Sequence, residues 1–592
     1  MQQLADPEDV AEVTMQPLRC DPPQRRVYRP PIASPATRWP ALQLHDVCGR
    51  LPTPPAFAHA DVWRQFLSNT MYALGRFGRV PPCGLLRRLA AAVARDATRY
   101  APEELSGAIW ALGALGEKPG AAWHATFDAA AAARLAQPGF GARAASVVLL
   151  SLARLEHHPG RVALGGYSAE LLRCAAQRRA GAQALANSLF AFASLHNLLR
   201  DRWQATQDAE RDANGGDARS ASMPRAAESL PRGDGDAGNP LSFPLPDALD
   251  ALCAAAAPLL PGCKAQELSQ ILWALGVLGH DPGPAWRAAF CVAACGADAA
   301  AGGARLGPGL RRFGPRELGA LLQSHAHLGV APPPAFLDAW AAAAAPQWPA
   351  FEARHAVHAA WALTAVDAPR RCASGASALN AAWTRLAAAC AEAEAAGIAA
   401  EALMPTAGWA QAGQAALVCA GTDGPDPLAA LPVACRSACT AALRRNARRG
   451  AASAMQRDVA AALFSGLGVT AELEASVAGG AASVDIALEA HALRGLPGVP
   501  QRRVALEVDG PCHDVRCGGR RRRAGGTAMR SRALAALGWR PLVLRHDAWP
   551  RGFDARVEAL HRLLRGADDD GALEASTDAE LAPALQAALR RR

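Results

Sequence analysis

LSGAIWALGALG at residues 105–116 recurs as LSQILWALGVLG at residues 268–279. In the first copy Leu105, Ile109 and Leu112 follow one another at three- and four-residue intervals, which places them on one face of a helix. The glycine that ends each copy stands where helices commonly terminate. The two segments therefore predict a repeated amphipathic helix, and a repeat decides the architecture of a chain more than any single element.

Weaker copies of this pattern occur at residues 71–78, 149–155, 189–195, 321–329 and 360–366. Aligned on one column, the seven copies place the following residues in equivalent positions: Leu74, Leu112, Leu152, Phe192, Leu275, His325 and Leu363. The first three steps are 38, 40 and 40 residues, and the last is 38. A step of 50 residues absorbs a Gly-rich loop at 302–309. The longest step contains residues 201–240, which are rich in Asp, Arg, Gly and Ser and are predicted to be a disordered insertion.

Each repeat unit is expected to hold two helices. Pro102 begins the motif helix of the best copy, and acidic residues follow it in the first turn. Small residues at Gly75, Gly113 and Gly276 favour close approach of neighbouring motif helices. A helix pair cannot bury its apolar face alone, whereas stacked pairs can. We therefore predict a mainly α protein, a right-handed α-solenoid of about seven helical-hairpin units. The units of 38–40 residues occupy 61–200 and 241–425.

The C-terminal part has a different pattern. Alternating residues at 482–488 and 502–510 indicate two strands, 525–538 a helix, and 539–549 a third strand. These elements predict a small α/β domain at 455–555. A tail follows at 566–592.

Charge is concentrated in this second domain. Residues 501–549 hold 11 arginines and 4 acidic residues, whereas the whole chain carries a net charge of +9. Only two of the 62 basic residues are lysines, which indicates a compositional bias toward arginine. The position of the arginines is therefore more informative than their number.

The remaining features bound the class of protein. The 15 cysteines are scattered and odd in number, which favours reduced thiols over a disulfide framework. No apolar run is long enough to span a membrane, so membrane insertion is not expected. Residues 1–60 form a Pro-rich leader that begins with acidic residues and turns Arg-rich after Met15. Two interpretations stay open for it, a disordered leader and a targeting segment.

The motif L-x-x-x-x-W-A-L-x-x-L-G resembles the octotricopeptide repeat of green-algal and plant organelle proteins. It is also similar to the helical region of the FAST-kinase-like family. The resemblance covers about 61–200 and 241–370, with a further unit near 411–420.

The C-terminal domain resembles the RAP domain. The matching residues are Val484-Asp485-Ile486-Ala487, Glu507-Val508-Asp509-Gly510-Pro511 with His513, Leu537-Gly538-Trp539, and Trp549. The resemblance implies an RNA-binding factor of the mitochondrial matrix or chloroplast stroma that acts in RNA processing, mRNA stability, rRNA maturation or translation. It implies single-stranded organellar RNA as the partner, and ribonucleoprotein granules or nucleases as further partners.

Candidate RNA-binding residues are chosen for their phosphate-binding or stacking chemistry: Arg520, Arg521, Arg522, Arg523, Arg530, Arg532 and His513. The planar fork of arginine donates two hydrogen bonds to a phosphate at once. Trp539 is a second stacking candidate, for which a position in the core is the alternative.

The RAP domain is similar to the restriction-endonuclease fold, and that similarity raises the question of catalysis. It implies Asp485 and Glu507 as carboxylate ligands of Mg²⁺ or Mn²⁺, with Asp509 in the position of the usual lysine. No lysine follows Lys264, so the catalytic set is incomplete and we expect no resident cofactor. Zinc at Cys512, His513 and Cys517 fits no standard spacing. A metal-dependent organellar ribonuclease and a protein-binding helical scaffold are the alternative functions.

Overall fold

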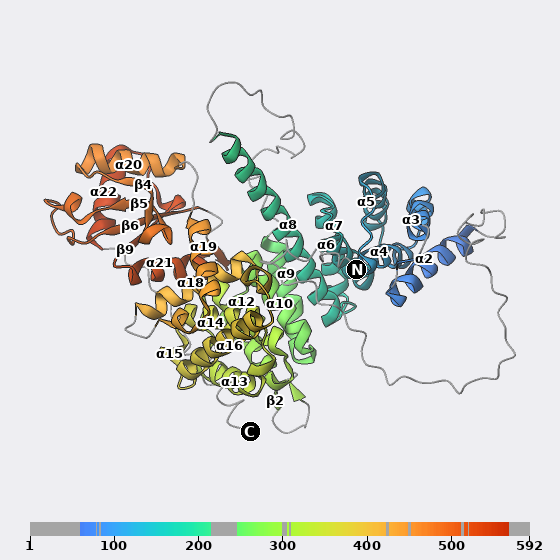
Figure 1. Cartoon of the computed structure of the whole chain (residues 1–592). Coiled ribbons are helices and arrows are strands. Elements are labelled where there is room, and N and C mark those ends of the chain that lie inside the picture. Colours follow the sequence, from blue (N-terminus) through green and yellow to red (C-terminus); the bar gives the residue numbers. More distant parts are fainter. Residues whose placement is uncertain are drawn as a thin grey trace. The chain divides into compact units, whose positions relative to one another are not determined.

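A computed structural model describes residues 60–78, 80–81, 84–214, 246–298, 305–306, 309–421, 426–447, 452–510, 514–518 and 520–566. The described chain is mainly helical and has a small mixed sheet region near its C-terminal end, which confirms the fold class at this level (Figure 1). It divides into two compact units, Met1–Ala256 and Ala257–Arg592. The predicted leader up to residue 59, His513, and the predicted tail after Gly566 lie outside the described residues.

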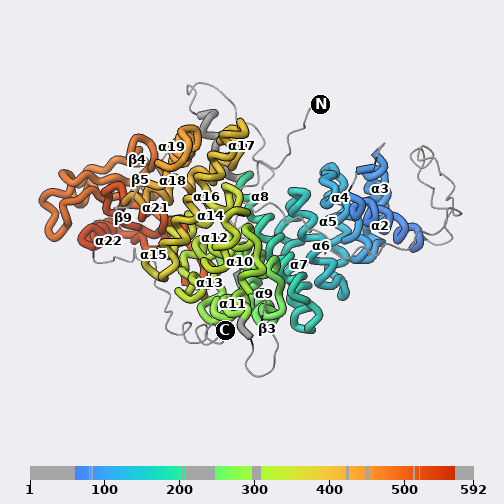
Figure 2. Tube along the Cα trace, turned by 60° about the horizontal axis from the view of Figure 1, so that its bottom comes forward, coloured from blue at the N-terminus to red at the C-terminus, as the bar shows by residue number. Residues whose placement is uncertain are grey.

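Unit 1 consists of two rows of helices (Figure 2). The motif helices follow one another in the first row: α2 (Ala60–Phe77), α4 (Pro102–Leu115), α6 (Ala142–Arg154) and α8 (Ala182–Asn214). The helices between them form the second row: α3 (Leu85–Arg95), α5 (Ala121–Leu135), α7 (Arg161–Ala176) and α9 (Pro246–Ala256). Each helix contacts the next helix of its own row, so the sequence repeat corresponds to a structural repeat here.

Burial of the aligned column explains this stacking. Leu112, Leu152 and Phe192 are fully buried between successive motif helices, whereas Leu74 on the first of these helices is only half-buried. Gly75 faces the next helix so closely that a Cβ atom would lie 2.8 Å from Cζ3 of Trp110. At Gly113 the same atom would meet Ser151 at an ordinary contact distance of 3.5 Å. The small residues thus set a close helix spacing, most strictly at Gly75.

Helix α8 corrects one boundary of the predicted disordered insertion. It continues through residues 201–214, which were expected to be disordered from their charge. This stretch contains neither glycine nor proline, and its Gln, Ala, Glu and Arg are good helix formers, so the helix continues to Asn214. Residues 215–245 lie outside the described residues.

Unit 2 begins with further motif helices: α10 (Ala265–Leu278), α12 (Pro315–His327) and α14 (Ala353–Ala365). They contact one another in order, and their column residues Leu275, His325 and Leu363 are buried. The other helical elements that precede the α/β region are η5 (Ala257–Gly262), α11 (Pro284–Cys295), η6 (Leu310–Arg312), α13 (Pro334–Ala344), η7 (Ala345–Ala350), α15 (Ala368–Arg371), α16 (Gly375–Ala395), α17 (Ala400–Leu403), α18 (Thr406–Ala420), η8 (Pro427–Ala430) and α19 (Val433–Ala447). The two-residue strand β2 (Ala297–Asp298) pairs antiparallel with β3 (Arg305–Leu306).

The α/β region of unit 2 is built on a four-stranded sheet in the order β4 (Glu472–Val477), β5 (Ala482–Leu488), β6 (Val504–Asp509) and β9 (Arg540–Arg545). The first three strands pair antiparallel, and β9 pairs parallel to β6. Strands β5, β6 and β9 and the helix α21 (Gly525–Ala536) lie where the sequence predicts them. Strand β4 was not predicted, and neither was strand β8, which the run Arg520–Arg523 forms.

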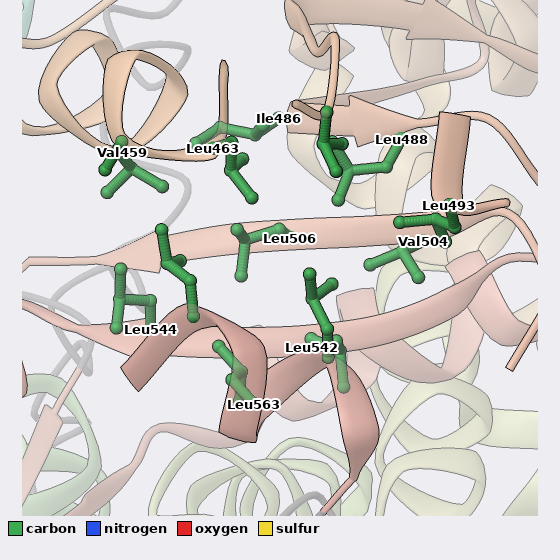
Figure 3. Close-up of a cluster of buried hydrophobic side chains, with 14 of the residues drawn as sticks. Val459, Leu463, Ile486, Leu488, Leu493, Val504, Leu506, Leu542, Leu544 and Leu563 are labelled. Carbon is green, nitrogen blue, oxygen red and sulfur yellow. The ribbon is translucent and has the colours of Figure 1, made fainter. Parts of the chain in front are cut away.

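Helices cover both faces of this sheet. On one face α20 (Ala454–Leu467) and α22 (Phe553–Arg565) bury an aliphatic core against the strands, with Leu463, Ile486, Leu506, Leu542 and Leu563 among its members (Figure 3). On the other face α21 packs Leu534 against Ala505 and Val484. Because Glu507 and Asp509 alternate with the core residues of β6, they face α21 rather than the aliphatic core.

Within the described part of the chain, no helix combines the length and hydrophobicity that a membrane crossing requires.

Candidate functional site

The arginine-rich hairpin belongs to a second, three-stranded sheet that includes a segment of the helical array. Strand β7 (Asp514–Cys517) pairs antiparallel with β8 and parallel with the two-residue strand β1 (His280–Asp281), which follows α10. The backbone N–H of Arg516 donates to the carbonyl of Gly279 at 2.8 Å. The hairpin is therefore attached by its backbone to the end of a motif helix.

Arg522 reinforces this attachment with its side chain. Its Nη2 lies 2.7 Å from Oδ2 of Asp281 and 2.9 Å from the carbonyl oxygen of Leu328, which ends α12. Asp281 is fully buried and also pairs with Arg287. Burial acts to raise the pKa of Asp281, but the charges of Arg287 and Arg522 outweigh it and lower the pKa below the usual range. Arg522 is thus a docking residue that stabilises a buried carboxylate and a helix end.

Arg532 has the same role at α14, the next motif helix along the chain. Its Nη1 donates to the carbonyl oxygens of Thr364 and Ala365 at the C-terminal end of α14, the second at 3.1 Å. Its Nη2 lies 3.6 Å from the carboxylate of Asp367. A cation at a helix C-terminus satisfies unpaired carbonyls and opposes the negative end of the helix dipole. Burial lowers the pKa of Arg532, and the negative charge of Asp367 partly offsets this effect.

Glycines let α21 reach the same helix ends. A Cβ on Gly525 would lie 1.5 Å from the carbonyl oxygen of Ala326, and one on Gly329 would lie 2.6 Å from the carbonyl oxygen of Arg523. Gly421, after α18, faces Ala536 at 2.4 Å in the same way. No side chain fits at these three positions. At Gly525 and Gly329 backbone therefore meets backbone, and at Gly421 the backbone meets the Cβ atom of Ala536.

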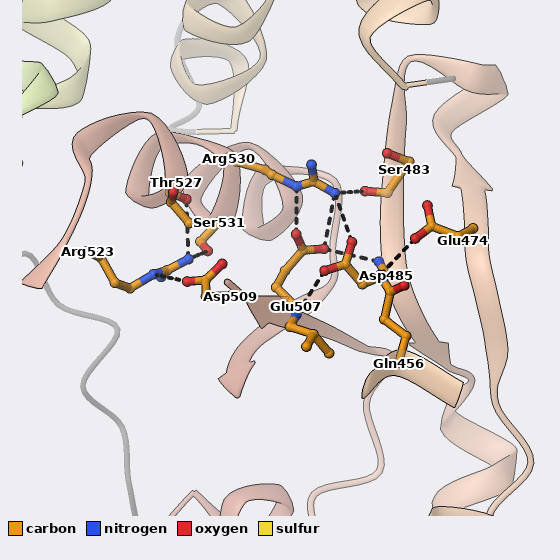
Figure 4. Close-up of polar contacts among 11 residues, drawn as sticks. Gln456, Glu474, Ser483, Asp485, Glu507, Asp509, Arg523, Thr527, Arg530 and Ser531 are labelled. Atoms are coloured by element: carbon orange, nitrogen blue, oxygen red, sulfur yellow. Dashed lines mark hydrogen bonds and ion pairs between the residues drawn. The ribbon is translucent and has the colours of Figure 1, made fainter. Parts of the chain in front are cut away.

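The candidate catalytic carboxylates lie together beneath α21, each almost completely buried (Figure 4). Arg530 Nε lies 2.7 Å from Oε2 of Glu507, and its Nη2 lies 3.9 Å from Oδ1 of Asp485. The same Nη2 donates to the carbonyl oxygen of Ser483 at 2.9 Å. One guanidinium therefore lies between the two carboxylates and supplies the positive charge that they face.

Asp485 also has a role in the backbone of the sheet. The ladder between β5 and β6 begins at the pair Ile486 and Leu506, so it does not include Asp485. Its Oδ2 accepts a hydrogen bond from the N–H of Val508 at 2.8 Å, while its own N–H donates to Oε1 of Glu507 at 3.3 Å. These side-chain bonds replace ladder bonds at the point where the two strands separate.

Asp509, the third candidate carboxylate, pairs with Arg523. Nε of Arg523 donates to Oδ2 of Asp509 at 3.1 Å, and its Nη2 donates to Oγ of Ser531 at 3.1 Å. Arg523 thereby joins β8 to the end of β6 and to α21. Like Arg522, Arg530 and Arg532, it is half-buried and bonded within the protein.

These contacts do not fit a divalent metal at Asp485 and Glu507. Mg²⁺ takes oxygen ligands and keeps several waters, and it would have to displace the guanidinium of Arg530 from between the carboxylates. Among the described residues no group of three or more His, Cys, Asp or Glu side chains is arranged to hold a metal ion. The arrangement instead accounts for both carboxylates as partners of an arginine.

The exposed arginines of the hairpin are Arg516, Arg520 and Arg521. Arg516 on β7 stands directly opposite Arg521 on β8, so their side chains share one face of the hairpin. Arg520 begins β8 and pairs with Cys517, so its side chain lies on the other face. The nearest carboxylate is that of Asp514, whose Oδ2 lies 3.9 Å from Arg521 and 3.3 Å from Arg545. Burial raises the pKa of Asp514, and these two arginines oppose that effect. The group formed by Arg516, Arg520 and Arg521 is hereafter called the arginine tip.

Two predicted site residues have other positions. Trp539 is buried in the core beside Leu534, with the guanidinium of Arg503 4.9 Å from its ring centroid, so it is a core residue. His513 lies outside the described residues, as does Cys512 of the considered zinc set. Asp281, Arg287 and Asp367 were not foreseen, because nothing in their local sequence distinguishes an acid that receives an arginine from far along the chain.

The fold and site define a mainly helical protein in which the motif helices α10, α12 and α14 end against a small α/β region. Comparison with known protein families found none whose pattern matches this chain, and no curated protein matches it.

Proposed function

We propose that this protein binds single-stranded RNA and that the arginine tip contacts the phosphate backbone. The observation that carries the proposal is the pairing of Arg516 with Arg521 on one side of an exposed hairpin. Like charges directly opposite one another are unfavourable in a sheet, and a bound polyanion relieves that repulsion. Arginine also matches phosphate geometry with two parallel hydrogen bonds.

The attachment of the hairpin supports this proposal. Arg522 and the β1–β7 pairing hold the arginine tip in a fixed position relative to α10 and α12. A contact surface that is ordered before binding loses less entropy when the ligand arrives. We propose that the helical units form an α-solenoid along which RNA runs, and that the α/β region is a RAP-like domain of restriction-endonuclease-like fold that ends it.

The proposed setting is gene expression in a mitochondrion or chloroplast, where the protein acts in RNA processing, mRNA stability, rRNA maturation or translation. This element of the proposal rests on the resemblance of the sequence motifs. Imaging of a fluorescently tagged chain together with mitochondrial and plastid markers tests it, and a tag confined to the cytosol contradicts it.

A binding assay with matched variants tests the RNA contact. Full-length protein is titrated into fluorescein-labelled single-stranded RNA and into a duplex of the same sequence over a range of salt concentrations. We expect tighter binding to the single strand. The double variant Arg520→Gln/Arg521→Gln should weaken it and lower the salt slope by about 1.4, at roughly 0.7 for each lost phosphate contact.

Arg494→Gln/Arg502→Gln is the control, since it removes the same charge. Both residues are exposed, and they lie near the end of the sheet where Leu488 pairs with Val504, away from the hairpin that follows Asp509. Equal losses in the two double variants would indicate nonspecific attraction and contradict the proposal. Absence of RNA binding by the unaltered protein would contradict it outright.

A further inference from the structure

The motif helices α2 and α4 each carry a stripe of exposed or partly exposed residues at equivalent positions of the repeat. On α4 this stripe is spaced by four, three and four residues, with buried residues between its members. It consists of Glu103, Gly107, Trp110 and Ala114. The equivalent stripe on α2, found from the aligned column, consists of the exposed residues Gln65, Asn69, Tyr72 and Arg76. Because α2 and α4 are neighbours in one row, the two stripes lie side by side.

An aromatic pair joins these stripes. Tyr72 and Trp110 hold equivalent positions in the repeat, two residues before Leu74 and Leu112. Their ring centroids are 4.8 Å apart with an interplanar angle of 37°. Tyr72 is 45% exposed, and Trp110 is partly exposed. The pair therefore offers an aromatic surface to solvent at the junction of two repeats.

The packing beneath the pair fixes the indole of Trp110. The ring lies against Gly75 of α2, where a Cβ atom would approach Cζ3 to 2.8 Å and Cε3 to 3.3 Å. Only glycine allows the indole this position. A ring held between two helices and still accessible loses little conformational entropy when a flat ligand stacks on it.

The neighbouring side chains indicate the chemistry of that ligand. Asn69 and Arg76 flank Tyr72 on its own stripe, and the stripe of α6 adds the exposed Arg143. The one acidic member of the α2 and α4 stripes is Glu103. Amide and guanidinium groups around a pair of aromatic rings suit nucleobases with attached phosphates. They do not suit the apolar face of a protein helix, which needs aliphatic surroundings.

We infer that Tyr72 and Trp110 stack bases of single-stranded RNA where it crosses from α2 to α4. This inference rests on the proposed function and deepens it, because it assigns base contacts to the helical repeats and phosphate contacts to the arginine tip. Stacking on a ring accepts every base, so the pair contributes affinity with little sequence preference.

Leucine substitutions on one helix test the inference. Tyr72→Leu keeps an apolar side chain at an exposed position but removes the ring. It should weaken binding of a fluorescein-labelled oligoadenylate by roughly 5-fold to 150-fold, the range for the loss of one base stack. Phe77→Leu is the matched control, because Phe77 is an exposed aromatic residue of α2 outside the stripe. Its binding should equal that of the unaltered protein.

Fluorescence gives a second measurement. A base stacked on Trp110 should quench its emission, so the quenching produced by RNA should be smaller in Trp110→Leu than in the unaltered protein. Circular dichroism verifies that the variants keep their helices. If Trp110→Leu loses its fold, Tyr72→Leu still decides the question because Tyr72 is exposed.

The outcomes separate this inference from the proposed function. Unchanged RNA binding in Tyr72→Leu overturns the inference, and so does an equal loss of binding in Phe77→Leu. In either case, weaker binding by Arg520→Gln/Arg521→Gln still supports the proposed function. An unaltered protein that binds no RNA overturns the proposed function itself.

Discussion

Arg522 and Asp281 are 241 residues apart in the chain, and their side chains meet at 2.7 Å. The contact joins the arginine-rich hairpin to the end of α10, and Arg287 shares the same carboxylate. Arg522 thus differs in role from its neighbour Arg521, which is exposed at the arginine tip. Of these two consecutive arginines, Arg522 holds the hairpin on the helical array, and in our proposal Arg521 binds RNA.

The first prediction concerns this buried carboxylate. Asp281→Asn should lower the free energy of unfolding of unit 2 by about 3 kcal/mol, since removal of one partner leaves buried charges of the other sign uncompensated. Urea unfolding followed by tryptophan fluorescence measures the change. Glu472→Gln, at an exposed position of β4, is the control and should shift the unfolding free energy by less than about 0.5 kcal/mol. Equal unfolding midpoints for Asp281→Asn and the unaltered protein would show that the ion pair is dispensable.

The second prediction compares two adjacent glycines. Gly525→Ala would place a Cβ atom 1.5 Å from the carbonyl oxygen of Ala326, so α21 must move away from α12. We expect a loss of about 3 kcal/mol or more in unfolding free energy. Gly526→Ala meets nothing within 4 Å and should be neutral or slightly stabilising, because alanine favours the helix. Limited proteolysis should cleave near α21 only in the first variant, and similar cleavage of both would contradict the contact.

The third prediction is a pH dependence. Burial lowers the pKa of His325 to about 4 from its ordinary 6.5, so the folded protein holds this residue neutral. Its contribution to stability is complete above pH 6.5 and is lost as the pH falls toward 4. Leucine occupies the same column in five other copies of the motif. The unaltered protein should therefore lose on the order of 2 kcal/mol of unfolding free energy between pH 7.5 and pH 5 through His325, and His325→Leu should not show this loss.

Urea midpoints at the two pH values measure this difference. His491→Leu is the control, because it removes an exposed histidine instead of a buried one. An identical pH dependence in His325→Leu and the unaltered protein would mean that His325 does not contribute to acid destabilisation.

The fourth prediction separates structure from catalysis at Glu507. Glu507→Gln removes the charge that Arg530 faces at 2.7 Å and should cost about 3 kcal/mol of unfolding free energy. RNA binding should stay unchanged, because Glu507 is buried away from the arginine tip. Labelled RNA incubated with the unaltered protein and Mg²⁺ or Mn²⁺ should remain intact. Cleavage that disappears in Asp485→Asn and Glu507→Gln would identify a metal-dependent ribonuclease instead.

The sequence predicts local elements well where a periodic signal exists. The motif helices α4 and α10 and the strands β5, β6 and β9 follow from spacing and alternation. The short strand β1 could not be predicted, since two residues carry no periodicity and their partner strand begins at Asp514. Helix α8 extends past its expected end because charge alone does not stop a helix.

The candidate site was harder to predict, because the role of an arginine depends on what lies opposite it. Arg522 and Arg532 were expected to bind phosphate, yet both donate hydrogen bonds to carbonyl groups at helix ends, and Arg522 also pairs with the buried carboxylate of Asp281. Arg530 was chosen in the same way and lies between Asp485 and Glu507. Successive residues of a strand point to opposite faces, so neighbouring arginines of one run meet different surroundings. The sequence of the run does not distinguish them.

The pairing of β1 with β7 also imposes an order on biosynthesis. β1 leaves the ribosome long before β7 is made, and at roughly 5–20 residues per second the interval lasts tens of seconds. Until β7 and α21 are made, the carbonyl groups at the ends of α12 and α14 lack their hydrogen-bond donors, Arg522 and Arg532. A chain that stops before Asp514 keeps those ends open permanently. Truncated products of this protein should therefore be recognised by proteases and chaperones as unfinished, whatever the state of their helices.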